Sequence, residues 1–383
     1  MRETTTAVAG TGMLAAMSIP QYPRLWATGL LLNLTRWMAI FLCSYSVNDM
    51  THSTFLVQLV GASLFAPMFL GGVLAGAIAD RLDRRRTLLA LLLVLLPLSA
   101  LMGVLEVSGS LRTWMVYPYC LAVGVGLLAD MTTRRAMVYD VVGPQMLTNA
   151  LALEALAMTG GATLGSLGAG TVISLLGIGE TFFVIAAVYV GAFVLLANVH
   201  PPDRASSPTG RPGITADILA AFRALPGQPA LVSVLGVTII VNLFYYSFTP
   251  LVSVFGERLG VGALLTSLLL SANSIGSIAG SSLIARGLPF GRGVIYVGGS
   301  TLALCALIVF AVSGWYPLAL VALMVAGVGI AGFATMQSVL VMVLAEDEMR
   351  GRAMGLLSMS IGVLPLSMIL LGLGRRRWGR RPA

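Results

Sequence analysis

The chain has 383 residues, of which 57% are hydrophobic and only 10% are charged. Soluble globular proteins carry about 25% charged residues, so 15 acidic and 23 basic side chains are too few to cover the surfaces of two or three soluble domains. This composition excludes a soluble enzyme, a disordered tail protein and a disulfide scaffold, and it indicates an all-α protein that crosses a membrane several times.

The predicted elements are membrane-spanning helices, each of which needs about 20 mostly apolar residues. Apolar runs of this size come as six, a polar break, and then five. We therefore predict a two-part bundle of about 11 helices, a pattern typical of transporters built from two repeats. The runs are 25–47, 54–79, 87–106, 113–130, 150–177, 181–199, 230–255, 262–285, 293–313, 316–345 and 353–373.

The same reading divides the chain into five parts. A first bundle spans 25–199 and a second, of five helices, spans 230–373. The remaining parts are an N-terminal segment 1–24, a central loop 200–229 and an Arg-rich tail 374–383.

The arginines predict the orientation of this bundle. With the N-terminus inside, the inner segments carry fifteen Arg, and the outer loops carry only Arg112 and Arg258. Because basic residues concentrate in cytoplasmic loops, we expect a cytoplasmic N-terminus and a plasma-membrane location, in a bacterial inner membrane. The net charge of +8 is thereby explained without nucleic acid.

The tail breaks this rule, because eleven spans place its five Arg outside. Three explanations remain open: a twelfth span lost by truncation or frameshift, a miscounted span, or incomplete insertion of the eleventh span. Loss of a twelfth helix is the preferred expectation, because the chain stops soon after an apolar run.

The first predicted helix carries Asn33 and Arg36 near its middle. A charge at that depth costs several kcal/mol unless it faces a wet cavity or a partner, and position 36 is too central for easy snorkelling. We expect Arg36 to line a substrate cavity with Asn33, where it binds an anionic group or pairs with a carboxylate.

The connection after the second span has Gly76, then Asp80 and Arg81, and then a basic cluster at Arg84–Arg86. It resembles the signature of the major facilitator superfamily. Further segments are similar to the enterobactin-exporter-like, or transmembrane secretion effector, branch: 22–26, 134–136 with 149–151, and 350–355. The resemblance covers the chain to about residue 373. It implies twelve helices in two bundles, alternating access and, in most members, proton-coupled export of small molecules.

This resemblance assigns the loop to an inner gate. Asp80 would accept from the N-terminus of the helix that begins near Arg350 and Arg352, and the positive-inside rule alone is the alternative for the arginines. The gating residues expected are Gly76, Asp80, Arg81, Arg84, Arg85, Arg350 and Arg352. The chain departs from the pattern at Asp83, where the family has Gly, at Arg36, where it has a small or acidic residue, and at Ser166, where it has Pro.

The fourth and fifth predicted helices supply candidates for proton coupling and packing. Glu154 and Asp130 are the candidate proton-coupling carboxylates. The alternative for Glu154 is a position near the cytoplasmic headgroups. For Asp130, an ion pair with Arg134 at i,i+4 spacing is favoured. Helix packing is expected at Gly161, Gly165 and Gly168, as general packing or as the family's exporter motif. The acidic residues at the outer helix ends, Asp49, Glu106, Glu180 and Glu257, are expected to be solvated caps.

Aromatic and amide side chains of the later helices complete the expected cavity. Residues 244–248 are read as an aromatic face of the seventh helix, where packing is the alternative role. The cavity residues expected here are Asn242, Tyr245, Tyr246, Asn273 and Gln337.

No Walker loop, metal-ligand set or Ser-His-Asp arrangement is found, so no enzyme, cofactor or metal is expected. The predicted function is secondary active, proton-coupled efflux of a small amphipathic molecule by a monomer in the lipid bilayer. The alternatives are a metabolite uptake carrier and a truncated, non-transporting membrane protein.

Overall fold

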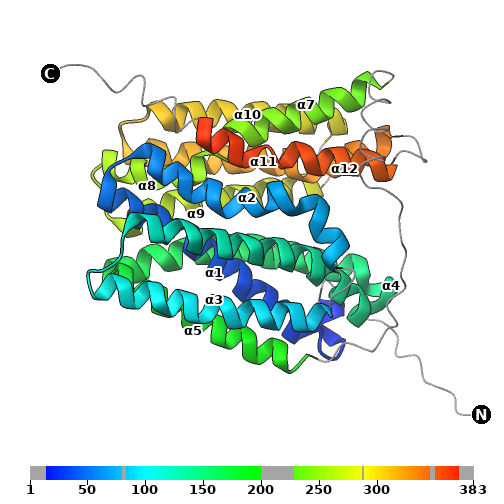
Figure 1. Ribbon diagram of the computed structural model, residues 1–383. Helices are drawn as coiled ribbons and strands as arrows, with labels where there is room; N and C mark the ends of the chain where they lie inside the picture. The colour runs from blue at the N-terminus through cyan, green and yellow to red at the C-terminus, as the bar shows by residue number, and fades with distance from the viewer. Residues whose placement is uncertain (1–13, 80–82, 200–227, 287–288, 346–349, 371–383) are drawn as a thin grey trace, which may run out of the picture.

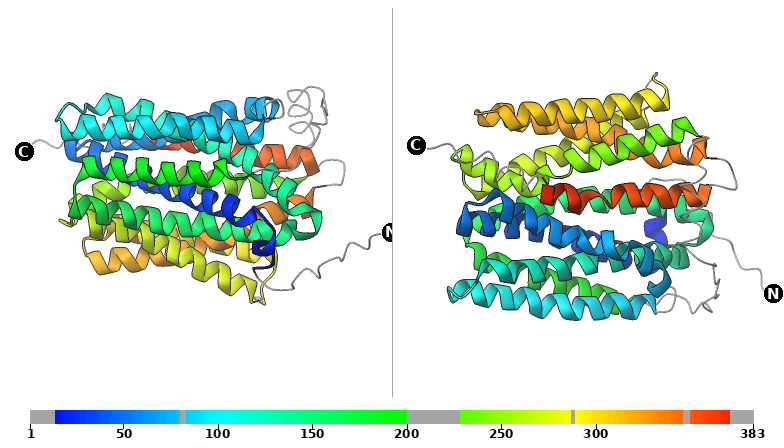
Figure 2. Two further views of the ribbon diagram at one scale, coloured as in Figure 1. Left: turned by 90° about the horizontal axis from the view of Figure 1, so that it is seen from below. Right: turned by 45° about the horizontal axis from the view of Figure 1, so that its top comes forward.

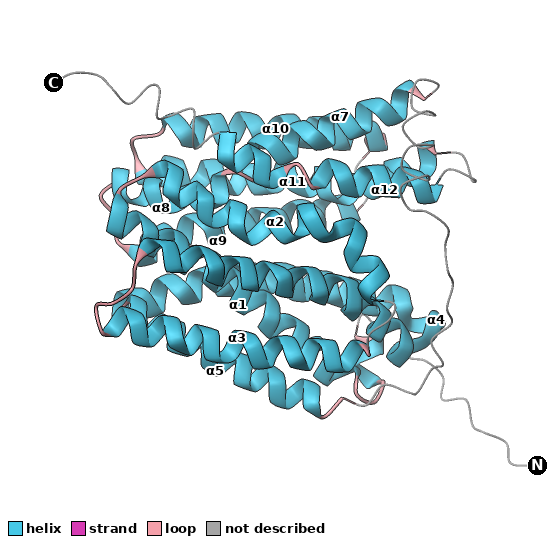
Figure 3. Cartoon of the chain, in the orientation of Figure 1, coloured by secondary structure: helices cyan, strands magenta, loops and turns pink. Residues whose placement is uncertain are grey.

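The computed structural model describes residues 14–79, 83–199, 228–286, 289–345 and 350–370. Within these ranges the regular structure is helical and includes no strand (Figure 1; Figure 3). This outcome follows from the composition, because a chain surrounded by lipid must satisfy its backbone polar groups within each segment.

The described residues of the first half include five long helices after a short 3-10 turn at Ala15–Ser18. They are α1 (Tyr22–Thr51), α2 (Thr54–Ala79), α3 (Arg84–Val107), α4 (Thr113–Leu175) and α5 (Ile178–Ala197).

The described residues of the second half include six labelled helices. They are α7 (Pro229–Phe244), α8 (Phe248–Arg258), α9 (Ala263–Ala285), α10 (Arg292–Val312), α11 (Tyr316–Leu344) and α12 (Arg350–Ile361).

Nine helical segments of the described chain are long and apolar enough to cross a membrane, and two shorter apolar helices occur at Thr54–Phe69 and Met359–Leu370. Together they coincide with the predicted apolar runs, so the all-α bundle and the multi-pass membrane character are confirmed. The boundaries of the five parts stay predictions, and most of the loop 200–229 and the whole tail lie outside the described residues.

The structure differs from the prediction in the fourth helix, because α4 contains two predicted spans and the segment between them. That segment, which includes Arg134, was expected to be a loop. The helix is interrupted at Gly143, whose backbone has φ 71° and ψ 175°. A positive φ is accessible to Gly at little cost, so the chain turns there and continues as a second helical stretch.

The seventh predicted helix is also interrupted. The aromatic segment was expected to lie on one helix face, but Tyr245–Ser247 form a turn between α7 and α8. Pro250 lies in the first turn of α8 and has no backbone N–H for the carbonyl of residue 246. Instead, the backbone N–H of Phe248 donates to the Tyr245 carbonyl at 3.2 Å, which tightens the turn.

The two halves pack side by side with their helices roughly parallel (Figure 1; Figure 2). Contacts between the halves are made by α1 and α2 with α8, and by α4 with α9. We call the end of the bundle where α3, α10 and α12 begin the arginine-rich end, and the end with the α1–α2 and α8–α9 connections the opposite end.

Candidate functional site

A cluster of charged side chains is buried inside the first half, with Asp130 of α4 at its centre. Arg36 of α1 places Nη2 3.3 Å from Asp130 Oδ2. Arg134 donates from Nε to Asp130 Oδ1 at 2.8 Å and places Nη2 2.6 Å from the same oxygen. The side chains of Arg36, Asp130 and Arg134 are only 13%, 6% and 6% exposed. One carboxylate thus holds two guanidinium groups away from solvent.

Helix α1 supplies the other partners of these guanidinium groups. Arg36 Nη1 donates to Asn33 Oδ1 at 2.8 Å, and Arg134 Nη1 donates to the Leu25 carbonyl at 3.0 Å. Arg36 and Asp130 also line a hollow of about 10 Å³ with residues of α3 and α5, roughly the space of one water molecule. Arg36 and Asn33 therefore lie in the interior of the first half, and their predicted contact with substrate stays a prediction.

Arg134 corrects the sequence interpretation, which counted it among the arginines of a loop. Because α4 remains helical beyond Asp130, Arg134 lies one turn further along the same helix face and is only 5% exposed. The i,i+4 pairing between Asp130 and Arg134 is confirmed. The link from Arg36 to Asp130 joins residues 94 positions apart, so local spacing gave no signal for it.

Glu154 joins this cluster from the second helical stretch of α4. A Cβ built on Gly29 would lie 3.3 Å from Glu154 Oε2 and 3.0 Å from Arg134 Nη1, so the carboxylate and the guanidinium face the same point of α1. Glu154 Oε1 is buried and has no hydrogen-bond partner among the described atoms. The cluster therefore contains two basic and two acidic side chains.

Neighbouring contacts fix α4 against α1 around Glu154. The Tyr22 hydroxyl donates to the Ala150 carbonyl at 2.8 Å, and Trp26 Nε1 donates to the Leu153 carbonyl at 2.8 Å. Both aromatic side chains therefore bond to the turn of α4 that carries Glu154.

A second polar group lies in the other half of the molecule. The amide of Asn273 in α9 donates to the Tyr245 hydroxyl at 2.5 Å and to the Leu323 carbonyl at 3.2 Å. Tyr245 is 1% exposed and packs edge-on against Tyr246, which is only partly buried. These residues hold α7, α9 and α11 together at the helix break.

Two further amides predicted for the cavity lie on α7 and α11, around Thr238. Asn242 donates to the Thr238 carbonyl at 2.8 Å, and Gln337 donates to Thr238 Oγ1 at 3.2 Å. Thr238 also bonds to the Tyr296 hydroxyl at 2.9 Å. The predicted cavity residues of the second half therefore form two groups, Asn242 and Gln337 around Thr238 and Asn273 with Tyr245 near Leu323, and the two groups contact α11 14 residues apart.

The residues predicted for the gate are only partly described. Asp80 and Arg81 lie outside the described residues, and neither the surroundings of Gly76 nor the side chains of Arg350 and Arg352 are described. Arg84 forms an ion pair with Asp140 of α4, a partner that the sequence interpretation did not name. Arg85 donates to the Ala197 carbonyl at the end of α5 at 2.5 Å.

Asp83 has a structural role at its departure from the family pattern. Its Oδ1 accepts from the backbone N–H of Arg86 at 2.8 Å, so it is the N-cap of α3. Its φ is −61°, which requires no Gly at this position.

The predicted helix-packing glycines do not behave alike. A Cβ on Gly161 would lie 2.6 Å from Asn33 Cβ, and one on Gly165 would meet the Leu34 carbonyl and lie 3.1 Å from Trp37 Cβ. These glycines allow α4 to approach α1 closely. Gly168 is different, because a Cβ added there would enter open space, so its predicted packing role is corrected.

The two halves are tied together at the opposite end by polar contacts that the sequence did not predict. Asn48 Nδ2 donates to Glu257 Oε2 at 2.6 Å, and His52 Nδ1 lies 2.7 Å from Glu257 Oε1. Glu257 was expected to be a solvated cap, but it joins α8 to α1. The hydroxyl of Ser253 donates to the Ser44 carbonyl at 3.2 Å one turn further in.

Contacts also run toward the middle of the bundle. Gln58 donates to the Ser247 carbonyl at 3.0 Å, and the Ser166 and Ser271 hydroxyls are 3.1 Å apart. Ser166, which departs from the family's proline, thus links α4 to α9. These contacts bring the halves together from the middle to the opposite end.

This two-part helical bundle, with buried charges inside it and polar contacts between its halves, has the architecture of a membrane transporter. The sequence matches the Major Facilitator Superfamily over residues 25–368, and the chain belongs to this family. No curated protein sequence matches the chain significantly.

Solved transporter structures share the fold at low sequence identity. A bacterial homolog of the human lysosomal transporter Spinster, in an inward-facing and unoccupied conformation, is 16% identical with a TM-score of 0.71, over 92% of this chain and 82% of that chain. The nucleoside transporter NupG is 14% identical with a TM-score of 0.71, over 93% and 91% of the two chains. A D-xylose-proton symporter is 15% identical with a TM-score of 0.64, over 92% and 88%.

Proposed function

We propose that this chain is a proton-coupled exporter of a small amphipathic molecule. It acts as a monomer by alternating access in a bacterial plasma membrane, with the arginine-rich end in the cytoplasm. The observation that carries the proposal is the buried cluster of Arg36, Asp130, Arg134 and Glu154, because its charge is balanced only while both carboxylates are ionised.

Glu154 is the proton-binding group in this proposal. Asp130 contacts both guanidinium groups, whereas one Glu154 oxygen has no hydrogen-bond partner among the described atoms. Protonation of Glu154 therefore breaks fewer contacts than protonation of Asp130. It leaves one excess positive charge in a low-dielectric interior, which favours movement of α4 relative to α1 until the proton is released.

The substrate binds between the halves, next to the polar residues of α7, α9 and α11. Tyr246 is partly buried and packs near Ala62 and Met368, where helices of the two halves meet. Its ring suits a flat or apolar part of a substrate, and the amide of Asn273, which bonds to the neighbouring Tyr245, suits a polar group of the substrate. This combination suits a molecule with both apolar and polar parts better than a small ion.

The described contacts between the halves fit a conformer closed at the opposite end. Opening that end requires breaking the Asn48–Glu257 and His52–Glu257 contacts. The gate at the arginine-rich end involves Asp80 and the start of α12, as the sequence pattern implies. The two gates would open in turn, which is the requirement for alternating access.

Transport measurements in inverted membrane vesicles test this function. We expect substrate to accumulate when a proton gradient is imposed, and we expect an uncoupler to abolish the accumulation. The opposite direction of movement would support the uptake carrier, and no flux of any amphipathic substrate in a broad panel would support the non-transporting alternative.

The variant Glu154→Gln tests the coupling site separately. It should lose gradient-driven accumulation but keep exchange of labelled for unlabelled substrate, because exchange moves no net proton. The matched control is Glu180→Gln, an exposed acid in the first turn of α5. Full gradient-driven accumulation by Glu154→Gln would refute the assignment of Glu154.

A further inference from the structure

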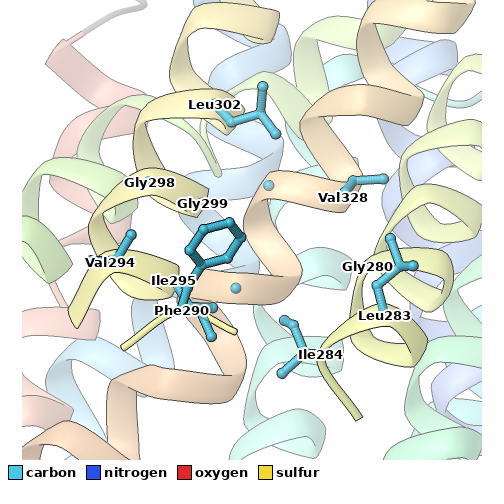
Figure 4. Close-up of a pocket in the computed structure, with 12 residues that line it drawn as sticks. Gly280, Leu283, Ile284, Phe290, Val294, Ile295, Gly298, Gly299, Leu302 and Val328 are labelled. Atoms are coloured by element: carbon cyan, nitrogen blue, oxygen red, sulfur yellow. The ribbon is translucent and has the colours of Figure 1, made fainter. Parts of the chain in front are cut away.

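An apolar pocket lies on the outside of the second half, away from the buried polar groups. It has a volume of about 300 Å³ and is formed by α9, α10 and α11 with Phe290 (Figure 4). Leu283, Phe290, Val294 and Leu302 line it and are 46%, 58%, 62% and 43% exposed. The pocket therefore faces the surroundings of the bundle rather than the interface between its halves.

The pocket exists because the backbones of α10 and α11 approach closely. A Cβ on Gly299 would lie 2.6 Å from the Gly329 carbonyl, and one on Gly332 would lie 2.8 Å from the Ile295 carbonyl. Gly298, next to this crossing, has open space where its side chain would be. The small residues thus join the helices and leave a recess beside the junction.

The depth of the pocket matches one leaflet of a bilayer. Its lining begins at Phe290, just before α10, and continues to Leu302. From Arg292 to Leu302, ten residues further along, the helix rises about 15 Å, half the roughly 30 Å hydrocarbon core. The recess therefore extends from the arginine-rich end to about the bilayer midplane.

Two arginines lie at the end of this recess that is nearest the arginine-rich end of the bundle. Arg286 follows α9 two residues after Ile284, which lines the pocket, and Arg292 begins α10 two residues before Val294. Arg286 and Arg292 are both exposed. Residues 258–345, which include all three helices, contain three Arg and no Asp or Glu. Three acidic residues follow at 346–348, outside the described residues.

We propose that this recess is a binding site for an anionic glycerophospholipid of the leaflet at the arginine-rich end. One acyl chain occupies the apolar recess, and Arg286 and Arg292 bind the phosphate and the anionic headgroup. An acyl chain fits because the lining is apolar and one leaflet deep. An anionic lipid is favoured over a neutral one because basic residues at a membrane surface attract its headgroup.

Lipid binding to the purified, delipidated full chain tests the site by native mass spectrometry. The probes are phosphatidylglycerol and phosphatidylcholine with the same acyl chains. Two basic residues near a surface predict about a 30-fold preference for phosphatidylglycerol at the first bound lipid. Equal affinity for the two lipids would overturn the proposal.

Two sets of variants separate the headgroup from the acyl chain. Replacing both arginines, Arg286→Gln with Arg292→Gln, should remove the preference and leave phosphatidylcholine binding unchanged. The control Arg86→Gln removes an exposed arginine from the start of α3 and should have no effect. A preference that survives the double replacement would overturn the headgroup assignment.

Gly298→Leu tests the recess, because Gly298 lines it and a Cβ added there has no protein atom within 4 Å. It should weaken first-site binding of both lipids at least tenfold. The control is Gly236→Leu, which also adds a side chain in open space but on α7. Unchanged binding by Gly298→Leu, or displacement of phosphatidylglycerol by millimolar inorganic phosphate, would overturn the acyl-chain site.

Discussion

Replacing Asp130 with Asn tests whether the buried charge cluster holds the first half together. Asp130 contacts Arg36 at 3.3 Å and Arg134 at 2.8 and 2.6 Å, and its side chain is 6% exposed. Asn is nearly the same size but uncharged, so the substitution leaves two guanidinium groups without their central anion. Solvent cannot compensate for this loss at such low exposure.

The expected destabilisation is large. Removing one partner of a buried ion pair costs about 3–5 kcal/mol, and here one substitution weakens two pairs. The Asn oxygen can still accept from Arg134, which keeps the effect within this range. At about 1.4 kcal/mol per factor of ten, the folding equilibrium should shift by more than about 100-fold.

Reversible unfolding of the purified chain by sodium dodecyl sulfate in mixed micelles measures this change. Glu180→Gln is the exposed control and should change the unfolding free energy little. The double variant Asp130→Asn with Arg134→Gln should lose less than the sum of the two single variants, because each removes the same contact. A loss below about 1 kcal/mol for Asp130→Asn, the range of surface pairs, would refute the reasoning.

Four further substitutions have expected outcomes. Gly165→Leu should prevent folding or make the bundle leaky to protons, because its side chain would meet the Leu34 carbonyl. Gly168→Leu should insert and seal normally, because a Cβ there enters open space. Expression and proton-leak assays compare the two variants. Glu257→Gln should weaken the contacts of Glu257 with Asn48 and His52 and so open the opposite end more often. A cysteine introduced at Ser44 in a cysteine-free background should then react faster with a membrane-impermeant thiol reagent. An unchanged reaction rate would contradict the gate. Asp80→Asn should reduce transport without reducing membrane insertion, as the sequence pattern implies, and undiminished flux would exclude that gate.

The helical bundle could be predicted from the sequence because lipid imposes a simple length and composition rule. The apolar runs are helical in the described residues, although the run 230–255 is divided into α7 and α8, and the spacing of Asp130 and Arg134 was sufficient to predict their ion pair. Both inferences depend only on residues close together along the chain.

Contacts between distant segments could not be predicted in this way. Glu257 accepts a hydrogen bond from Asn48, which lies 209 positions away in the sequence. The position of Glu257 at a helix end does not identify that partner. Arg36 is similar, because a mid-span charge predicts that some partner exists without identifying Asp130. The helix break at Tyr245 could have been predicted from Pro250, which lies five residues later. The continuous apolar run favoured a single helix instead.

The uninterrupted first stretch of α4 has a mechanical consequence. Asp130 and Asp140 lie on the same rigid helix, about 15 Å apart at roughly 1.5 Å per residue, and Gly143 ends that stretch. Asp130 holds the interior guanidinium groups, while Asp140 is bound to Arg84 at the start of α3. If α4 moves on protonation of Glu154, as proposed above, this rigid segment would transmit the movement from Asp130 to the beginning of α3 through the Asp140–Arg84 ion pair.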